Sequence, residues 1–225
     1  MSPVKLAIFD VDGTLIDSQG HINAAMAEAF AAVGEEVPGR AEIRAVIGLS
    51  LPRAVATLAP HWDEATLGCA LAAYKDAFAT LADLQGAAAA PLFPGTIEML
   101  DVLARHDELI LGIATGKSRR GLERILDLHD LRGRFLTTQV ADDHPSKPHP
   151  AMVLAALDAV GCPPGEAVMI GDTAFDMDMA RAAGVATIAV SWGYHPVDRL
   201  EAAGPDALVH DMAALAGTVA ETLGL

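Results

Sequence analysis

The chain has 225 residues, of which 52% are hydrophobic, and it carries a formal net charge of −15 at pH 7. This length fits one large domain or an ordinary domain with a small one, and the hydrophobic content excludes a disordered chain. The negative charge argues against nucleic acid or an anionic membrane surface as the main partner. An anionic ligand would need a local group of cations.

Two further features bear on the compartment. Cys69 and Cys162 lie far apart in the sequence and match no metal-ligand or disulfide spacing. The first residues lack the pattern of a signal peptide, and no apolar run approaches the roughly 20 residues that span a bilayer. We therefore expect a cytoplasmic protein.

The predicted elements alternate between strands and helices over most of the chain. A short buried strand is expected over 4–9, followed by four helices over 21–33, 40–47, 51–59 and 63–84. Glycine and proline then mark a connector over 85–95. Beyond it we expect helices over 96–105, 118–128, 150–160, 175–183 and 212–223, and strands over 109–114, 135–140, 167–170, 185–190 and 207–209.

This alternation predicts an α/β fold, in which a parallel sheet carries helices on both faces. The helices before residue 90 are expected to form a small helical insertion after the first strand. The expected division is an α/β core of residues 1–15 and 91–225 and a helical cap of residues 16–90.

Four polar clusters follow predicted strands or lie in loops: 10–14, 115–118, 146–150 and 171–176. The carboxyl ends of parallel strands lie on one side of a sheet, where ligands gather. Three of these clusters should therefore meet at one edge, and the fourth can reach it.

Together the clusters supply three or four carboxylates, a hydroxyl and a lysine. Carboxylate oxygens are the ligands that a hard cation such as Mg²⁺ prefers. Hydroxyl, backbone N–H and lysine groups suit a phosphoryl group. The set points to metal-assisted phosphoryl transfer to a carboxylate nucleophile.

The clusters resemble the motifs of the haloacid dehalogenase superfamily, in its phosphatase branch. That family's pattern is DxDGT, then a Ser or Thr at a strand end, a Lys before a helix, and GDxxxD. Here these are residues 10–14, Thr115, Lys147 and 171–176, in the family's order. The resemblance implies a Rossmann-like core and a magnesium-dependent phosphatase.

The resemblance also assigns roles to the core motifs. Asp10 would be the nucleophile that forms an aspartyl-phosphate. Asp12 would protonate the leaving oxygen and then activate water. Thr115 and the N–H of Gly116 would bind the phosphoryl oxygens, and Lys147 would keep Asp10 ionised and neutralise phosphoryl charge.

By the same resemblance, magnesium would be held by four residues of two motifs. Asp10, the backbone carbonyl of Asp12, and Asp172 would be direct ligands. Asp176 would be a ligand through water or would orient the others.

The helical insertion is similar to the C1-type cap of this family, and the stretch 43–51 is similar to cap segments of phosphoglycolate phosphatase-like members. Such a cap would exclude water and favour a small phosphate ester, of the phosphoglycolate kind. Arg44, Arg53 and Lys75 are candidates for gripping a carboxylate or second phosphate of the substrate.

Other readings stay open. A phosphosugar mutase or a pyrophosphatase of the same superfamily would carry the same motifs. A receiver-type phospho-acceptor module is a more distant alternative, because such modules are shorter and lack the helical insertion.

We interpret His144 and His149 as parts of a proline-rich loop rather than metal ligands, and expect His21 on the surface. The substrate and oligomeric state are not determined by the sequence.

Overall fold

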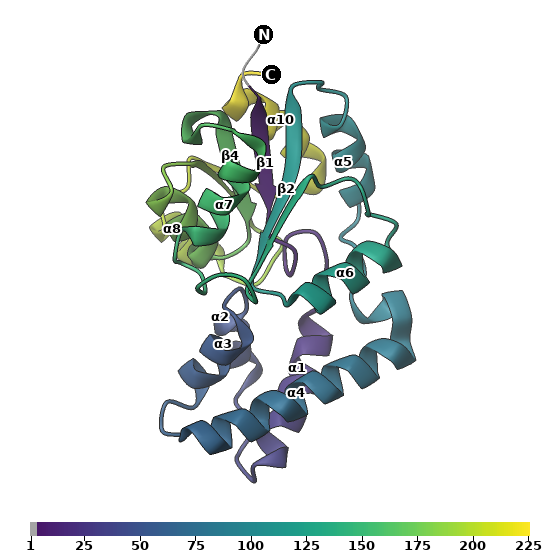
Figure 1. Cartoon of the computed structure of the whole chain (residues 1–225), viewed down its shortest axis with the longest axis vertical. Helices are drawn as coiled ribbons and strands as arrows, with labels where there is room; N and C mark the ends of the chain where they lie inside the picture. Colours follow the sequence, from purple (N-terminus) through teal and green to yellow (C-terminus); the bar gives the residue numbers. More distant parts are fainter. Residues whose placement is uncertain (1–3) are drawn as a thin grey trace.

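A parallel sheet carries the polar clusters at one of its edges (Figure 1). The computed structural model describes residues 4–225, and in this range the sheet has six strands in the order β3-β2-β1-β4-β5-β6. The strands are β1 (Lys5–Phe9), β2 (Leu109–Thr115), β3 (Thr137–Val140), β4 (Ala167–Gly171), β5 (Ala186–Val190) and β6 (Ala207–Val209). The predicted parallel α/β fold is confirmed.

Strand β1 lies at the centre of the sheet, between β2 and β4. Its last residue, Phe9, pairs with Ile113 of β2 and with Ile170 of β4. A central parallel strand is covered on both faces, which explains why this segment is apolar almost throughout. The three strands end side by side, so the residues that follow them are brought together.

Helices cover both faces of the sheet, as predicted. On one face Ala7 and Phe9 pack in a cluster with α5 (Thr96–Leu103), α6 (Arg119–Leu128) and α10 (Met212–Leu223). On the other face Leu6 and Ile8 pack against α7 (Ala151–Val160) and α8 (Ala174–Ala182). The alternation of side chains along β1 thus serves two hydrophobic layers.

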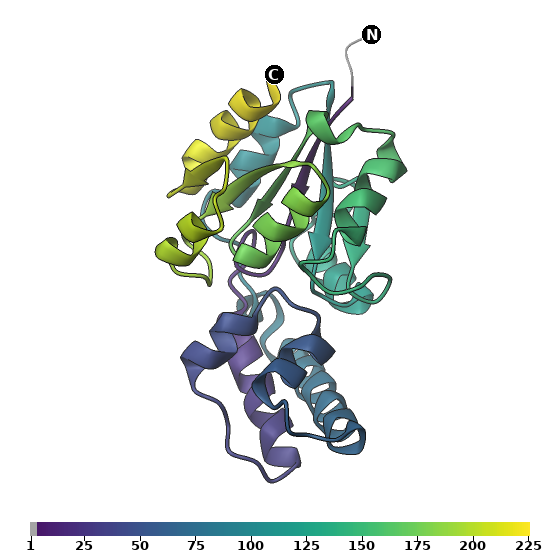
Figure 2. The same cartoon turned by 90° about the vertical axis from the view of Figure 1, so that its left-hand side faces the viewer.

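Of the five α-helices between β1 and β2 in the described sequence, the first four gather beyond the carboxyl edge of the sheet (Figure 2). They are α1 (Gln19–Ala32), α2 (Arg40–Val46), α3 (Leu51–Leu58) and α4 (Glu64–Gln85). Their apolar faces share a cluster that also contains Tyr194, from the loop after β5. The helical insertion after the first strand is confirmed, whereas its treatment as a separate domain of residues 16–90 stays a proposal.

Most predicted boundaries lie within two residues of those observed, and three short elements were not predicted. These are α9 (Val197–Ala202) and two 3₁₀ turns, η1 (Gly86–Ala89) and η2 (Pro164–Glu166). Each is too short to show a helical repeat in the sequence. No helix within residues 4–225 is long and apolar enough to cross a membrane. The expected cytoplasmic location stays a prediction.

Candidate active site

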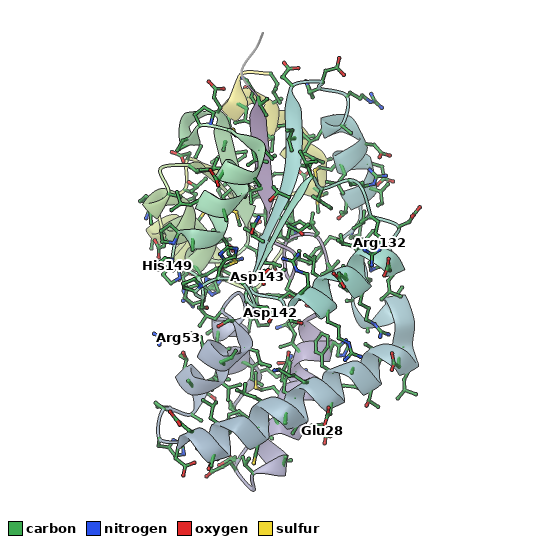
Figure 3. All side chains as sticks on the ribbon, in the orientation of Figure 1. Glu28, Arg53, Arg132, Asp142, Asp143 and His149 are labelled. Atoms are coloured by element: carbon green, nitrogen blue, oxygen red, sulfur yellow. The ribbon has the colours of Figure 1, made fainter. Side chains whose placement is uncertain are left out.

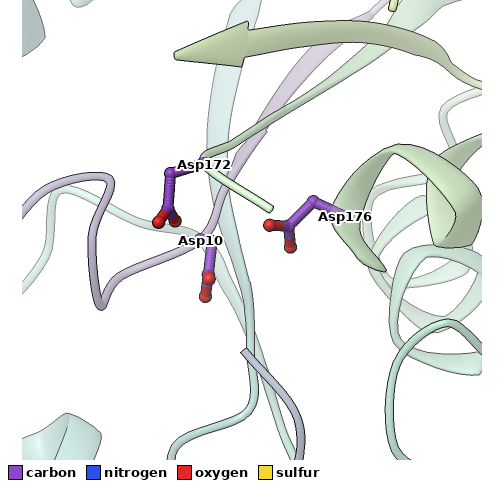
Figure 4. A group of neighbouring side chains, drawn as sticks. All are labelled: Asp10, Asp172 and Asp176. Atoms are coloured by element: carbon purple, nitrogen blue, oxygen red, sulfur yellow. The ribbon is translucent and has the colours of Figure 1, made fainter. Parts of the chain in front are cut away.

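Three buried carboxylates converge at the carboxyl edge of the sheet (Figure 4). Asp10 follows β1, Asp172 follows β4, and Asp176 lies in the first turn of α8. One oxygen from each lies within 4.8 Å of the others, and the side chains are at most 1% exposed. Like charges held this close and away from water need a counter-charge.

Lys147 supplies part of that counter-charge from the loop between β3 and α7. Its buried Nζ lies 3.0 Å from Asp10 Oδ1 and 2.6 Å from Asp176 Oδ1. Burial alone would lower the pKa of Lys147, but the charges of both carboxylates and the hydrogen bond to Asp176 together raise it above its ordinary value. Lys147 is therefore a permanent cation that ties two of the motifs together.

Among the described residues, Lys147 is the one cation that pairs with Asp10. Both of its carboxylate oxygens are buried, and neither accepts a hydrogen bond from the described residues, because the Lys147 contact lacks hydrogen-bond geometry. Burial, with the charges of Asp176 and Asp12, raises the pKa of Asp10 to about 7 against the opposing effect of Lys147. A cation bound beside Asp10 would offset this repulsion and favour the ionised carboxylate.

The other two carboxylates have partners of their own. Asp172 accepts hydrogen bonds from Thr14 Oγ1 (3.1 Å) and from the backbone N–H of Tyr194 (2.7 Å). Asp176 accepts from Thr173 Oγ1 (2.6 Å) and from the N–H of Thr173 (3.1 Å). Burial and the charges of Asp176 and Asp10 raise the pKa of Asp172. With one oxygen on Lys147 and the other on Thr173, Asp176 fits the orienting role better than direct ligation.

Glycine is required in the turn after β1. Gly13 has φ +86°, and a Cβ at this position would lie 2.1 Å from Oδ2 of Asp172. Gly193 packs on the other side of the same carboxyl group, where an added Cβ would lie 2.2 Å from Asp172 Cβ. The turn can approach Asp172 closely only without side chains at these positions.

Asp12 lies beside Asp10 but faces different partners. Its Oδ1 accepts a hydrogen bond from Ser18 Oγ (2.5 Å) and lies 2.9 Å from Lys117 Nζ. The same ammonium group lies 5.3 Å from the centre of the Phe78 ring on α4. Sequence reasoning gave Lys117 and Ser18 no role in the site. The position of Lys117, two residues after the end of β2, was the available signal.

Thr115 ends β2, and Gly116 follows it, beside the two carboxylates of the first motif. The hydroxyl oxygen of Thr115 accepts a hydrogen bond from the N–H of Lys117 (3.3 Å). A Cβ at Gly116 would lie 2.5 Å from the carbonyl oxygen of Gly48, in the loop between α2 and α3. This is a close contact between the sheet edge and the helical insertion.

A cavity of about 470 Å³ separates the sheet edge from the four inserted helices. From the core it is lined by Asp10, Asp12, Thr115, Gly116 and Lys117, among others. The structure therefore brings four of the predicted site residues to one cavity, and Lys147, Asp172 and Asp176 lie behind Asp10.

The three cationic candidates on the inserted helices have different surroundings. Lys75 lines the cavity. Arg44 instead donates through Nη2 to the carbonyl oxygen of Gly193 (3.0 Å) and through Nε to that of Tyr194. Arg53 is exposed on the outer side of α3 (Figure 3). The structure brings neither Arg44 nor Arg53 to the cavity.

The expectation that His21 lies on the surface is wrong. Its side chain is buried, stacks on Phe78 with 3.9 Å between ring centres, and donates from Nε2 to the Phe78 carbonyl oxygen at 2.9 Å. Burial lowers the pKa of His21. Helix α1 turns this residue toward α4, which its sequence neighbours do not reveal. His144 contacts Gln139 Oε1 (2.8 Å), and His149 accepts from the N–H of Ala151 (3.2 Å).

Comparisons with known proteins agree with this geometry. The sequence pattern of the haloacid dehalogenase-like hydrolases matches residues 7–190. The chain belongs to this family. It is 34% identical, over 98% of its length and 95% of the relative's, to a Dickeya dadantii protein described as "Probable phosphatase IndB". It is 30% identical to a phosphoglycolate phosphatase of Pseudomonas savastanoi pv. phaseolicola, over 92% of this chain and 77% of that protein.

Solved structures of the family have the same arrangement. A hydrolase from Pseudomonas syringae superimposes with a TM-score of 0.84 at 26% identity, and the match covers 96% of this chain and 98% of that one. The predicted membership of the haloacid dehalogenase superfamily, in its phosphatase branch, is confirmed. The chain is accordingly a hydrolase of the phosphatase type.

Proposed function

We propose that the chain is a magnesium-dependent phosphatase that hydrolyses a small phosphate monoester through an aspartyl-phosphate on Asp10. The observation that carries this proposal is the state of Asp10. It lines the cavity, lies 3.0 Å from the Lys147 ammonium, and has two buried carboxylate oxygens that accept no hydrogen bond from the described part of the chain.

The residues at the sheet edge fit a magnesium ion. Three buried carboxylates face one another, and Lys147 is the only cation that forms an ion pair with any of them within residues 4–225. Hard oxygen donors of this kind suit Mg²⁺. Asp10, Asp172 and the backbone carbonyl of Asp12 would hold the ion, with Asp176 as a positioning residue. When bound, it would neutralise charge on the phosphoryl oxygens and polarise the phosphorus.

In the first step, an Asp10 carboxylate oxygen attacks phosphorus and the bond from phosphorus to the alcohol oxygen breaks. Asp12 donates a proton to that alcohol oxygen as it leaves. The hydroxyl of Thr115 and the N–H of Gly116 hold the phosphoryl oxygens, and Lys147 balances their charge.

In the second step, Asp12 takes a proton from water, and the water oxygen attacks phosphorus. The bond between phosphorus and Asp10 breaks, which releases phosphate and restores the carboxylate. Ser18 and Lys117 hold the Asp12 carboxylate at the cavity wall, which keeps it in position for both proton transfers.

We also propose that residues 16–90 act as a cap over a core of residues 1–15 and 91–225. Support comes from the cavity, which is lined by both parts, and from hydrogen bonds between them such as Ser50 N–H to Ser146 Oγ (2.8 Å). A closed cap would limit the access of water to the phosphorylated Asp10.

The proposal is tested with purified protein and p-nitrophenyl phosphate. Hydrolysis should require Mg²⁺, stop on chelation, and fall on the order of 10⁴-fold or more in Asp10→Asn, because the nucleophile is lost. Asp158→Asn, which changes an exposed carboxylate on α7, is the matched control and should retain activity.

Full activity in the presence of chelator, or in Asp10→Asn, would contradict the proposal. The same preparation is given hexose phosphates and pyrophosphate. Transfer of phosphate between sugar positions would favour the mutase alternative, and preferential cleavage of pyrophosphate would favour the pyrophosphatase.

A further inference from the structure

The inserted helices present an apolar wall to the cavity. The wall includes side chains of α1, α2 and α4: Ile22, Met26, Ile43, Val46, Phe78 and Ala79. Asp10 and Asp12 line the same cavity from the sheet edge. A phosphate monoester with its phosphorus at Asp10 and its alcohol oxygen at Asp12 would therefore project its alcohol part toward this wall.

The cations that line the cavity either form an ion pair with a carboxylate of the protein or are exposed to solvent. Lys117 pairs with Asp12 at 2.9 Å, and Arg124 pairs through Nη1 with Asp83 at 2.6 Å, whereas its buried Nε has no partner among the described residues. Lys75 and Arg120 are exposed. Within the described part of the chain, each cation at the cavity is therefore either paired with a carboxylate of the protein or exposed.

The N-terminus of α3 also lines the cavity, but it offers few free backbone N–H groups to an anion. The N–H of Ser50 is already bonded to Ser146 Oγ at 2.8 Å. Pro52, the second residue of the helix, has no N–H. An anion at this helix end would find fewer free donors than the first turn of a helix usually offers.

The cavity is also large for a two-carbon alcohol. Its volume of about 470 Å³ falls in the range of roughly 300–1,000 Å³ typical of pockets for drug-sized ligands. Glycolate would leave most of the apolar wall uncovered and would place a carboxylate against it without a partner, which is unfavourable.

We propose that the substrates are phosphate monoesters whose alcohol part is apolar and larger than glycolate, with that part packed against α1, α2 and α4. This inference rests on the proposed phosphatase function and defines its substrate class. It departs from the phosphoglycolate-like substrate expected from the sequence.

The test compares benzyl phosphate with phosphoglycolate, because both release a primary alcohol and differ mainly in the group beyond it. We expect kcat/KM to be at least about tenfold higher for benzyl phosphate, since an apolar pocket discriminates by roughly 10–200-fold for a single methylene. Hexyl phosphate should also exceed phosphoglycolate.

A variant that adds a cation to the apolar wall gives a second test of substrate preference. Ala79→Lys places an ammonium group on the apolar wall and should shift the ratio of the two kcat/KM values toward phosphoglycolate by about tenfold. Ala72→Lys is the matched control: it lies on the exposed side of α4, outside the cavity, and should leave the ratio unchanged. Circular dichroism verifies that both variants are folded.

The outcomes separate the two proposals. If the protein hydrolyses p-nitrophenyl phosphate but prefers phosphoglycolate to benzyl phosphate, the apolar substrate class is wrong and the phosphatase function stands. If it hydrolyses none of the three with Mg²⁺ present, the proposed function fails and this inference fails with it. If Ala79→Lys does not fold, the wild-type ratio alone decides.

Discussion

The protonation of Asp10 is controlled by the residues that surround it. This residue leaves the central strand with both carboxylate oxygens buried, next to Asp172 and Asp176, and with Lys147 as its one charged partner among the described residues. Burial and like charge favour the protonated carboxyl group, which explains why its pKa is raised to about 7. A divalent cation would favour the ionised form, so proton and metal should compete for this residue.

We therefore expect magnesium affinity to weaken as the pH falls. Below a pKa of about 7, Asp10 is protonated in the metal-free protein, and the ion must displace that proton to bind. One displaced proton corresponds to a dissociation constant that rises about tenfold per pH unit below 7. Calorimetric titration of metal-free protein with Mg²⁺ at pH 6, 7 and 8 measures it. Equal affinity at pH 6 and pH 8 would show that Asp10 does not titrate in this range.

Helix α2 illustrates how an element that supplies no catalytic side chain can hold the site together. Arg44 reaches from this helix to the carbonyl oxygens of Gly193 and Tyr194, and the N–H of Tyr194 donates to Asp172. One short loop thus links the inserted helices to a candidate metal ligand. Arg44, a candidate for substrate binding from the sequence, thus fastens α2 to the loop after β5 in the structure.

Arg44→Ala should consequently lower kcat/KM by about tenfold for every substrate, p-nitrophenyl phosphate included. The expected size reflects the loss of hydrogen bonds from a charged group, about 1.5–3 kcal/mol, which weakens closure of the cap. Arg40→Ala, an exposed residue at the start of the same helix, is the control and should behave like the wild type. A loss confined to substrates that carry a second anion would instead assign Arg44 to substrate binding.

At the scale of the whole molecule, the site is formed where two groups of elements meet (Figure 1). The sheet edge supplies the polar groups, and the inserted helices close the cavity over them. The two approach closely at Gly116, where an added Cβ would lie 2.5 Å from the Gly48 carbonyl oxygen and 2.7 Å from that of Leu49. A Cβ at this position would block the approach of the loop between α2 and α3 to the end of β2.

Gly116→Ala should keep the cap from closing completely. The new methyl group meets backbone atoms that cannot give way without a shift of the loop between α2 and α3, so we expect kcat to fall at least about tenfold while the core stays folded. Gly165→Ala, at a position where a Cβ meets nothing within 4 Å, is the matched control. Unchanged kcat in Gly116→Ala would mean that catalysis does not need the close approach seen here.

Much of the fold could be predicted from local pattern. Apolar runs predicted the six strands within two residues of their ends. Asp63, an acidic residue directly before the helical pattern, caps α4 by accepting a hydrogen bond from the N–H of Thr66 (2.8 Å). The core motifs could be found because each follows a strand, and parallel strands end at one edge. Ser50 shows that a residue type predicts a helix start better than it predicts the contacts there. It occupies the N-cap of α3, but its side chain makes no capping hydrogen bond.

The sequence by itself determined the order of the elements and the chemistry at the sheet edge, because periodicity and strand-end motifs are local properties. Only the tertiary structure decided which distant side chains meet. It placed Lys117 on Asp12, buried His21 against Phe78, and turned Arg44 to the backbone of the core. These contacts join residues at least 57 positions apart, and they depend on how the inserted helices pack over the sheet, which no local pattern specifies.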